Sequence, residues 1–164
     1  MERRLIVLRH AKSDWDSDAT NDHERPLNKR GRHDAPRVGR RLAKLGWQPE
    51  LVLSSDATRA RETWLRMSDT FDETTDVRYL PSLYLAGYEA VCAALEDVPA
   101  TIATLMVVGH NPGWEVMVGQ LIGEAVELTT ANAALLAIEA ASWPEAVAQT
   151  GHWELRRTVR PKEL

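Results

Sequence analysis

Two stretches of the sequence are apolar at every position rather than at alternate positions. One runs from Leu5 to Leu8 and the other from Leu105 to Val108. A strand with apolar side chains on both faces has to be covered on both faces, which is typical of the central strands of a parallel sheet. Because parallel neighbours need a crossover between them, such strands also require intervening helices. The two runs therefore predict an α/β fold.

Helix and strand patterns alternate through the rest of the chain. The expected helices cover residues 27–45, 57–69, 88–95 and 112–122, and the further strands cover 51–53, 77–80, 133–138 and 152–157. Asp56 and Asn111 are expected to cap the second and fourth helices. This order predicts a three-layer α/β domain, with a mainly parallel central sheet and helices on both faces. Since no repeat or Gly-, Ser- or Pro-rich linker divides the chain, we expect a single domain over residues 1–164.

The cysteine count and the N-terminus favour a cytoplasmic protein. Cys92 is the only cysteine, so one chain can form neither an internal disulfide nor a thiolate zinc cluster. The first apolar run has only four residues before Arg9. It is too short for a signal peptide or a membrane span, and no membrane association is expected.

Charge is unevenly distributed along the chain. Net charge is −4, yet residues 1–66 hold 15 Lys and Arg against 10 Asp and Glu, while residues 67–164 hold 5 against 14. The overall acidity, without interleaved basic and aromatic residues, argues against nucleic-acid binding. The cations of residues 30–44 are interpreted either as one solvated helix face or as part of a half of the molecule that faces an anion.

Cationic or nucleophilic side chains follow three of the predicted strands. They are Arg9 with His10, Arg59, and His110. Each of these alone is a weak signal, but the carboxyl ends of parallel strands meet at one edge of a sheet. Cationic groups brought together there repel one another unless an anion lies among them. A phosphoryl group fits, because its transfer spreads negative charge over three oxygens that arginine binds well. The helix N-terminus behind Asn111 is expected to add backbone N–H donors.

A histidine can serve as the nucleophile of such a site. Either His10 or His110 could offer a neutral imidazole nitrogen with a free lone pair. We favour His10, because it closes a buried strand where a backbone carbonyl can accept its Nδ1–H and leave Nε2 facing the ligand. His110 is then expected to stay protonated as a charge donor.

Four segments resemble motifs of the histidine phosphatase superfamily, which includes the phosphoglycerate mutases. Residues 8–13, Leu-Arg-His-Ala-Lys-Ser, resemble its Arg-His motif, and residues 54–60, Ser-Ser-Asp-Ala-Thr-Arg-Ala, are similar to its Ser-Ser-Pro-x-x-Arg-Ala segment. Residues 108–112, Val-Gly-His-Asn-Pro, match its second-histidine segment. Residues 25–31, Arg-Pro-Leu-Asn-x-x-Gly, resemble a stretch of the SixA branch, whose short chains this one matches in length.

The resemblance implies a phosphoglycerate mutase-like fold and a metal-independent phosphatase without a cofactor. His10 would be the phospho-accepting nucleophile, and water would hydrolyse the phosphohistidine formed on it. Arg9, Arg59 and His110 would hold the phosphoryl oxygens, and Asn111 would also border the substrate.

The sequence departs from the family where a proton donor is expected. Ser82 stands where the mutase-like branch carries a glutamate, and Asn111 where acid phosphatases place an aspartate. Glu89 remains a candidate donor at the start of a predicted helix. An alkoxide leaving group needs protonation, whereas imidazole, with a pKa of about 6.5, is far less basic. We therefore expect a phosphohistidine protein substrate.

Two alternatives stay open on the sequence alone. One is a small-molecule phosphomonoesterase that uses the same His10 nucleophile. The other is a module that recognises phosphorylated partners without turnover. Most of the six tryptophans are expected to lie in the core, although Trp15 and Trp114, which lie close to motif residues, are candidates for the pocket wall. His23 is expected to be a surface or structural residue.

Overall fold

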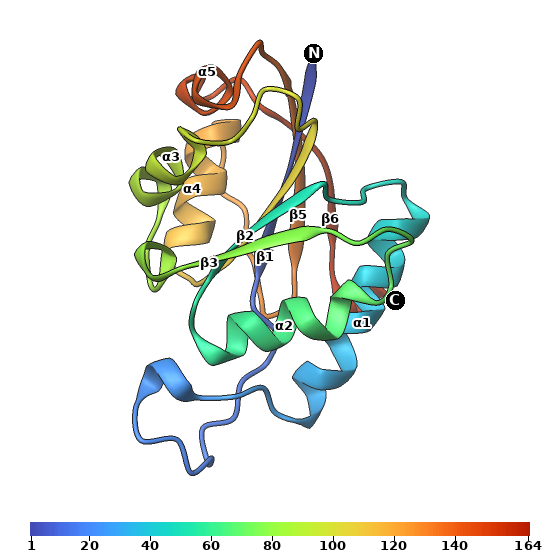
Figure 1. The fold of residues 1–164 in the computed structure, drawn as a ribbon, viewed down its shortest axis with the longest axis vertical. Helices are drawn as coiled ribbons and strands as arrows, with labels where there is room; N and C mark the ends of the chain where they lie inside the picture. The colour runs from blue at the N-terminus through green and yellow to red at the C-terminus, as the bar shows by residue number, and fades with distance from the viewer.

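A six-stranded mixed sheet forms the centre of the structure, a computed structural model that describes residues 1–164 (Figure 1). Its strands are β1 (Glu2–Arg9), β2 (Leu51–Ser55), β3 (Asp76–Leu80), β4 (Thr104–Gly109), β5 (Ala133–Glu139) and β6 (Glu154–Val159). They lie in the order β3-β2-β4-β1-β5-β6. The pairs β3–β2, β2–β4 and β4–β1 are parallel, and only β5 runs against its neighbours. The expected mainly parallel sheet is confirmed.

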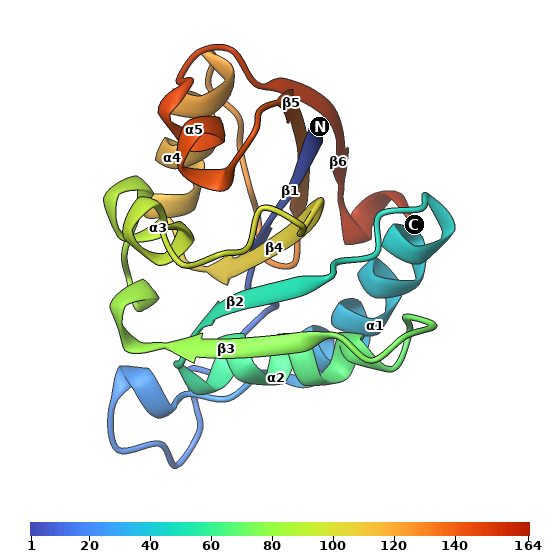
Figure 2. The ribbon, with the colours of Figure 1, turned by 45° about the horizontal axis from the view of Figure 1, so that its top comes forward.

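Helices cover both faces of this sheet, as expected for three layers (Figures 1 and 2). On one face lie α1 (Lys29–Lys44) and α2 (Thr58–Ser68), and on the other α3 (Tyr88–Leu95), α4 (Gly113–Ile122) and α5 (Trp143–Ala148). Short 3-10 turns occur at η1 (Asp22–Glu24), η2 (Pro81–Leu83) and η3 (Pro161–Glu163). None of the helices is long and apolar enough to cross a membrane.

The apolar runs divide between two cores, one on each face of the sheet. In β1, Leu5 and Val7 belong to the core beneath α3, α4 and α5, while Ile6 and Leu8 belong to the core beneath α1 and α2. All four side chains are fully buried. Burial of each such side chain stabilises the fold by about 1.5–3 kcal/mol. Alternation of side chains across a strand thus explains why an uninterrupted apolar run was needed.

Two predicted helix caps are wrong. Helix α4 begins after Pro112, and no side chain caps it; Asn111 instead donates its amide to Glu115 at 2.6 Å. Helix α2 begins after Ala57, and Asp56 pairs with His23 at 2.8 Å. Asn111 also donates to the Leu128 carbonyl at 2.8 Å, so in both cases a partner outside the helix binds the polar side chain that local sequence would assign to a helix end.

The segment of residues 25–31 positions α1 against the loop that follows β1. The Asn28 side chain caps α1 by accepting from the Gly31 N–H at 2.9 Å. A Cβ on Gly31 would lie 2.2 Å from the Lys12 carbonyl oxygen, so only glycine allows this close approach. Ser13 and Leu27 pair as an antiparallel bridge beside it. The helix start therefore fixes the backbone just after His10.

Candidate functional site

A cavity of about 340 Å³ opens at the carboxyl ends of β1 and β4, beside the start of α2. The five residues expected at the substrate all line it, and they come from segments far apart in the chain: Arg9, His10, Arg59, His110 and Asn111. The sheet brings them together because β1 pairs with β4, which places Arg9 opposite Gly109.

His10 is buried and held in one tautomer. Its Nδ1 lies 2.7 Å from the Ala11 carbonyl oxygen, and its Nε2 accepts a hydrogen bond from Arg59 Nε at 3.4 Å. Burial, together with the neighbouring His110 and Arg59, lowers the pKa of His10 to about 3, although the hydrogen bond to the Ala11 carbonyl opposes the shift. The imidazole is therefore neutral near pH 7, with its lone pair on Nε2.

His110 lies beside His10, with 5.2 Å between the ring centroids. Its Nε2 is 2.8 Å from Ser55 Oγ, while its Nδ1 is buried without a partner. Burial lowers the pKa of His110 to about 4, and the charge of Arg59 adds to the shift. The expectation that His110 stays protonated is thus wrong for the free protein. An anion in the cavity would raise this pKa again.

Arg59 is buried and bound on one side by a residue that the sequence analysis missed. Its Nη1 donates to the Asp22 carbonyl at 2.7 Å, and its Nη2 donates to Asp22 Oδ2 at 3.0 Å. Only Nε is directed toward His10. The guanidinium is therefore fixed before any ligand arrives.

Asp22 gathers three further donors from two other side chains. Arg25 donates to Oδ1 from Nε at 3.2 Å and from Nη2 at 3.1 Å, and the Tyr84 hydroxyl donates to Oδ2. The bond from Tyr84 and the charge of Arg59 lower the pKa of Asp22 to about 2, although partial burial opposes them. One sequence signal was available for Asp22, because it stands three residues before the Arg25 of the SixA-like segment. Tyr84 carried none.

Arg9 and Asn111 share a backbone partner at the rim of the cavity. Arg9 Nη1 donates to the Leu128 carbonyl at 3.1 Å, and Asn111 Nδ2 donates to the same oxygen at 2.8 Å. Arg9 Nε and Asn111 Oδ1 are buried without a partner. Both side chains thus keep hydrogen-bonding capacity for a ligand.

Three residues singled out from the sequence have different surroundings. Glu89 is exposed in the first turn of α3 and is not among the residues that line the cavity. Trp114 is wrong as a pocket wall, because it is fully buried in the core with its ring against Gly109. Trp15 does line the cavity; its ring is 72% exposed and stacks on the Arg25 guanidinium, 3.6 Å from ring centroid to Cζ.

The charge of the cavity favours an anion. Asp22 is the only carboxylate in the lining, which contains four cationic side chains: Arg9, Lys12, Arg25 and Arg59. Fixed arginine donors beside a neutral histidine suit a group with several anionic oxygens. No three His, Cys, Asp or Glu side chains converge in a way that could hold a metal ion.

Comparison with known proteins finds a family model that matches part of the chain and relatives that match most of it. Residues 5–84 match the model of the histidine phosphatase superfamily, branch 1. A chloroplastic protein of Arabidopsis thaliana is 44% identical over 173 residues, which cover 98% of this chain and 79% of that protein. A Mycobacterium tuberculosis protein is 38% identical over 105 residues, or 64% of this chain and 63% of that one.

Solved structures share the fold. A protein assigned as phosphohistidine phosphatase SixA from Agrobacterium tumefaciens has a TM-score of 0.81 and 27% identity, over 97% of this chain and 98% of that one. A second protein assigned as SixA, from Nakamurella multipartitia, has a TM-score of 0.84 and 26% identity, over 98% of this chain and 97% of that one. A mycobacterial glucosyl-3-phosphoglycerate phosphatase, at 17% identity and a TM-score of 0.68 over 95% and 98%, shows the fold alone.

Fold and cavity together define a phosphatase that uses a histidine nucleophile. The chain belongs to the histidine phosphatase superfamily, in its SixA-type branch.

Proposed function

We propose that the protein hydrolyses phosphohistidine on a partner protein, with His10 as the residue that accepts the phosphoryl group. The state of His10 carries this proposal. Its Nδ1 is tied to the Ala11 carbonyl at 2.7 Å and burial keeps the ring neutral, so Nε2 presents a lone pair to the cavity. A neutral imidazole with a directed lone pair is what phosphoryl transfer to histidine requires.

Two displacements at phosphorus complete the reaction. In the first, His10 Nε2 forms a bond to phosphorus while the bond from phosphorus to the substrate ring breaks; that ring nitrogen keeps the electron pair, and the ring, protonated on its other nitrogen, leaves as neutral imidazole. In the second, an oxygen of water forms a bond to phosphorus, the bond to Nε2 breaks with its electron pair returned to Nε2, and inorganic phosphate leaves together with the proton that the water gives up. We expect Arg59 Nε, the unpartnered Nε of Arg9 and the unpartnered Nδ1 of His110 to hold the phosphoryl oxygens in both steps.

The choice of a nitrogen leaving group rests on the absence of a protonated carboxyl group among the residues that line the cavity. Asp22 is the only carboxylate there, and its pKa of about 2 leaves it ionised near pH 7. An ionised carboxylate cannot protonate an alkoxide. Imidazole, with a pKa of about 6.5, leaves without a strong acid. This chemistry favours phosphohistidine over a sugar phosphate.

A substrate panel tests the proposal. Turnover is measured on a phosphohistidine peptide, on p-nitrophenyl phosphate and on 3-phosphoglycerate under the same conditions. We expect kcat/KM to be highest for the peptide and lowest for 3-phosphoglycerate, whose leaving group is an alkoxide. Faster hydrolysis of 3-phosphoglycerate than of the peptide would overturn the assignment.

A further inference from the structure

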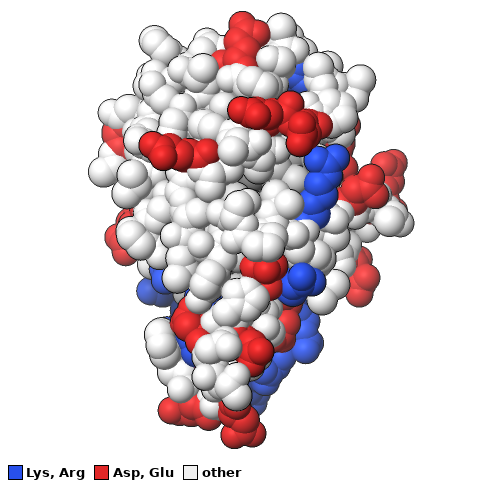
Figure 3. Space-filling model, turned by 60° about the vertical axis from the view of Figure 1, so that its left-hand side comes forward, with Lys and Arg blue, Asp and Glu red and all other residues white.

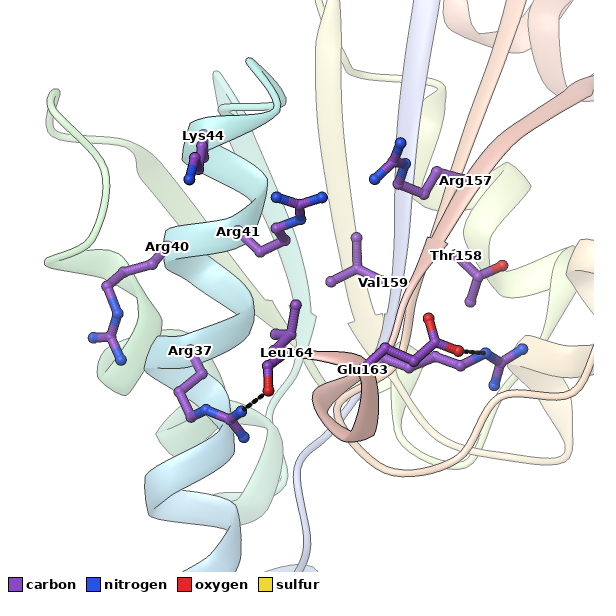
Figure 4. A pocket seen from close by; sticks show the side chains of 10 residues that line it. Arg37, Arg40, Arg41, Lys44, Arg157, Thr158, Val159, Glu163 and Leu164 are labelled. Atoms are coloured by element: carbon purple, nitrogen blue, oxygen red, sulfur yellow. Dashed lines mark hydrogen bonds and ion pairs between the residues drawn. The ribbon is translucent and has the colours of Figure 1, made fainter.

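A second cavity, of about 500 Å³, lies between the C-terminal half of α1, the edge strand β6 and η3 (Figure 4). It shares no lining residue with the cavity at His10. Glu163 is its only acidic side chain, whereas six cationic side chains line it: Arg37, Arg40, Arg41, Lys44, Arg157 and Arg160. Four of these cations come from α1 and two from the C-terminal region, and none of them lines the phosphatase site.

Helical spacing explains how α1 supplies four of these cations. Residues three or four apart lie on one side of a helix, and Arg37, Arg40, Arg41 and Lys44 follow that spacing. Two of the six cations in the lining have acidic partners. Arg37 Nη1 lies 3.4 Å from Asp34 Oδ1, and Arg160 Nε lies 3.9 Å from Glu163 Oε1.

The other four cations make no side-chain hydrogen bond or ion pair in the structure. Among them, Arg41 from α1 and Arg157 from β6 extend toward each other across the cavity (Figure 4). Facing guanidinium groups repel unless an anion lies between them. Four cations of the lining are therefore without a protein counter-charge, and a bound anion would supply one.

This concentration of cations is local. The chain as a whole has a net charge of −4. In the upper part of the face shown in Figure 3, Asp and Glu are scattered and Lys and Arg are few, whereas in the lower part side chains of both signs are interspersed. Cations that gather around a hollow on an acidic protein favour a compact anion over a long polyanion that follows the surface.

We propose that this cavity binds a small polyanion that carries at least two phosphate groups, clamped between Arg41 and Arg157. Its volume is within the range of about 300–1,000 Å³ that is usual for small-ligand sites. Arginine side chains from opposite walls can each bind a phosphate in bidentate fashion. The lining contains no aromatic side chain on which a nucleobase could stack, which argues against a nucleic-acid strand.

Calorimetric titration with inorganic tripolyphosphate tests this site. The titrations use Arg59→Ala protein, because tripolyphosphate also has affinity for the cavity at His10. In that background we compare two pairs of substitutions. The test pair is Arg41→Gln and Arg157→Gln, made together, and the control pair is Arg66→Gln and Arg78→Gln, made together. The control arginines are exposed, lie on α2 and β3, and make no side-chain contact, so both pairs lower the net charge equally.

We expect the Arg59→Ala protein to bind one tripolyphosphate. The Arg41 and Arg157 pair of substitutions should weaken this binding on the order of tenfold or more, and the control pair should change it little. With Arg59 intact, the same Arg41 and Arg157 substitutions should leave turnover of p-nitrophenyl phosphate unchanged. Thermal unfolding confirms that each variant is folded.

Three results would overturn the proposal. One is the absence of tripolyphosphate binding in the Arg59→Ala protein, which would confine binding to the phosphatase cavity. Another is an equal loss of affinity in the Arg41 and Arg157 pair and in the control pair, which would show that the effect comes from net charge alone. The third is tighter binding of hexaglutamate than of tripolyphosphate with the same dependence on Arg41 and Arg157, which would make the cavity a site for acidic protein segments.

Discussion

Asp22 holds the Arg59 guanidinium from the side opposite the nucleophile. The Asp22 carbonyl and carboxylate accept from Nη1 at 2.7 Å and from Nη2 at 3.0 Å, which leaves Nε 3.4 Å from His10 Nε2. Arg59 is thus oriented by a residue that is itself held by Arg25 and Tyr84. Such preorganisation avoids the cost of aligning a donor during the reaction.

Asp22→Asn is expected to lower kcat/KM for p-nitrophenyl phosphate on the order of tenfold, or about 1.4 kcal/mol, because the amide loses the charge that fixes Arg59. Arg59→Ala should cost more, about 2–4 kcal/mol. The matched control is Asp18→Asn, an exposed residue of the same loop without a side-chain partner. Unchanged kcat/KM in Asp22→Asn would show that Arg59 needs no such support.

Acidification is expected to destabilise the protein through its two buried site histidines. Their pKa values, about 3 for His10 and about 4 for His110, lie below the value of about 6.5 in an unfolded chain. Below about pH 6.5 the unfolded chain therefore binds more protons than the folded one, and the free energy of unfolding falls until the folded-state pKa values are reached. Each histidine contributes at most about 2 kcal/mol between about pH 7 and pH 5.

Denaturant unfolding at a series of pH values checks this effect. The variant His10→Asn, His110→Asn should lose less stability than the wild type between neutral and acidic pH, whatever its stability at neutral pH. His152→Asn, at an exposed position, serves as the control. Parallel pH profiles for the wild type and the double variant would contradict the assignment of neutral imidazoles.

Arg3 is expected to be a major source of stability rather than of activity. Its buried guanidinium donates to four carbonyl oxygens, those of Ala100, Ile102, Ala140 and Ala141, at 2.6–3.1 Å. Arg3→Met would leave these acceptors without their donor and should lower the free energy of unfolding by about 3 kcal/mol. Arg66→Met is the surface control. A loss below about 1 kcal/mol would mean that water replaces the guanidinium.

Trp15 is expected to contact the protein that carries the phosphohistidine. Its ring lies at the cavity and is 72% exposed, within reach of a partner surface. Trp15→Ala should raise KM for a phosphohistidine protein on the order of tenfold, yet change KM for p-nitrophenyl phosphate little. Leu65→Ala removes an exposed apolar side chain on α2 as a control. Equal rises for both substrates would show that Trp15 acts through the stacked Arg25 instead.

The sequence predicts the sheet and the centre of the site for the same physical reason. Strands buried on both faces carry uninterrupted apolar runs, and the polar residue after each run must lie at the sheet edge. His10 and His110 are the first residues after the strands that carry these runs, so their convergence could be inferred without knowledge of the loops.

Contacts that depend on loop conformation or on burial could not be predicted in this way. Asp22 reaches Arg59 only because the segment before α1 folds back over the start of α2, and no periodicity encodes that path. The predicted caps were wrong because Asn111 and Asp56 bind tertiary partners, the Leu128 carbonyl and His23. The prediction that His110 stays protonated was wrong because the burial of this side chain depends on packing that cannot be read from the sequence.

Direct detection of the phosphorylated enzyme tests the central claim. The wild type and His10→Ala are incubated with phosphoramidate as phosphoryl donor, quenched in alkali and analysed by mass spectrometry of peptides, after thermal unfolding has shown that both are folded. The account predicts an acid-labile phosphoryl group on His10 of the wild type, and neither label nor turnover in His10→Ala. A label on His110, or turnover by His10→Ala near that of the wild type, would contradict it.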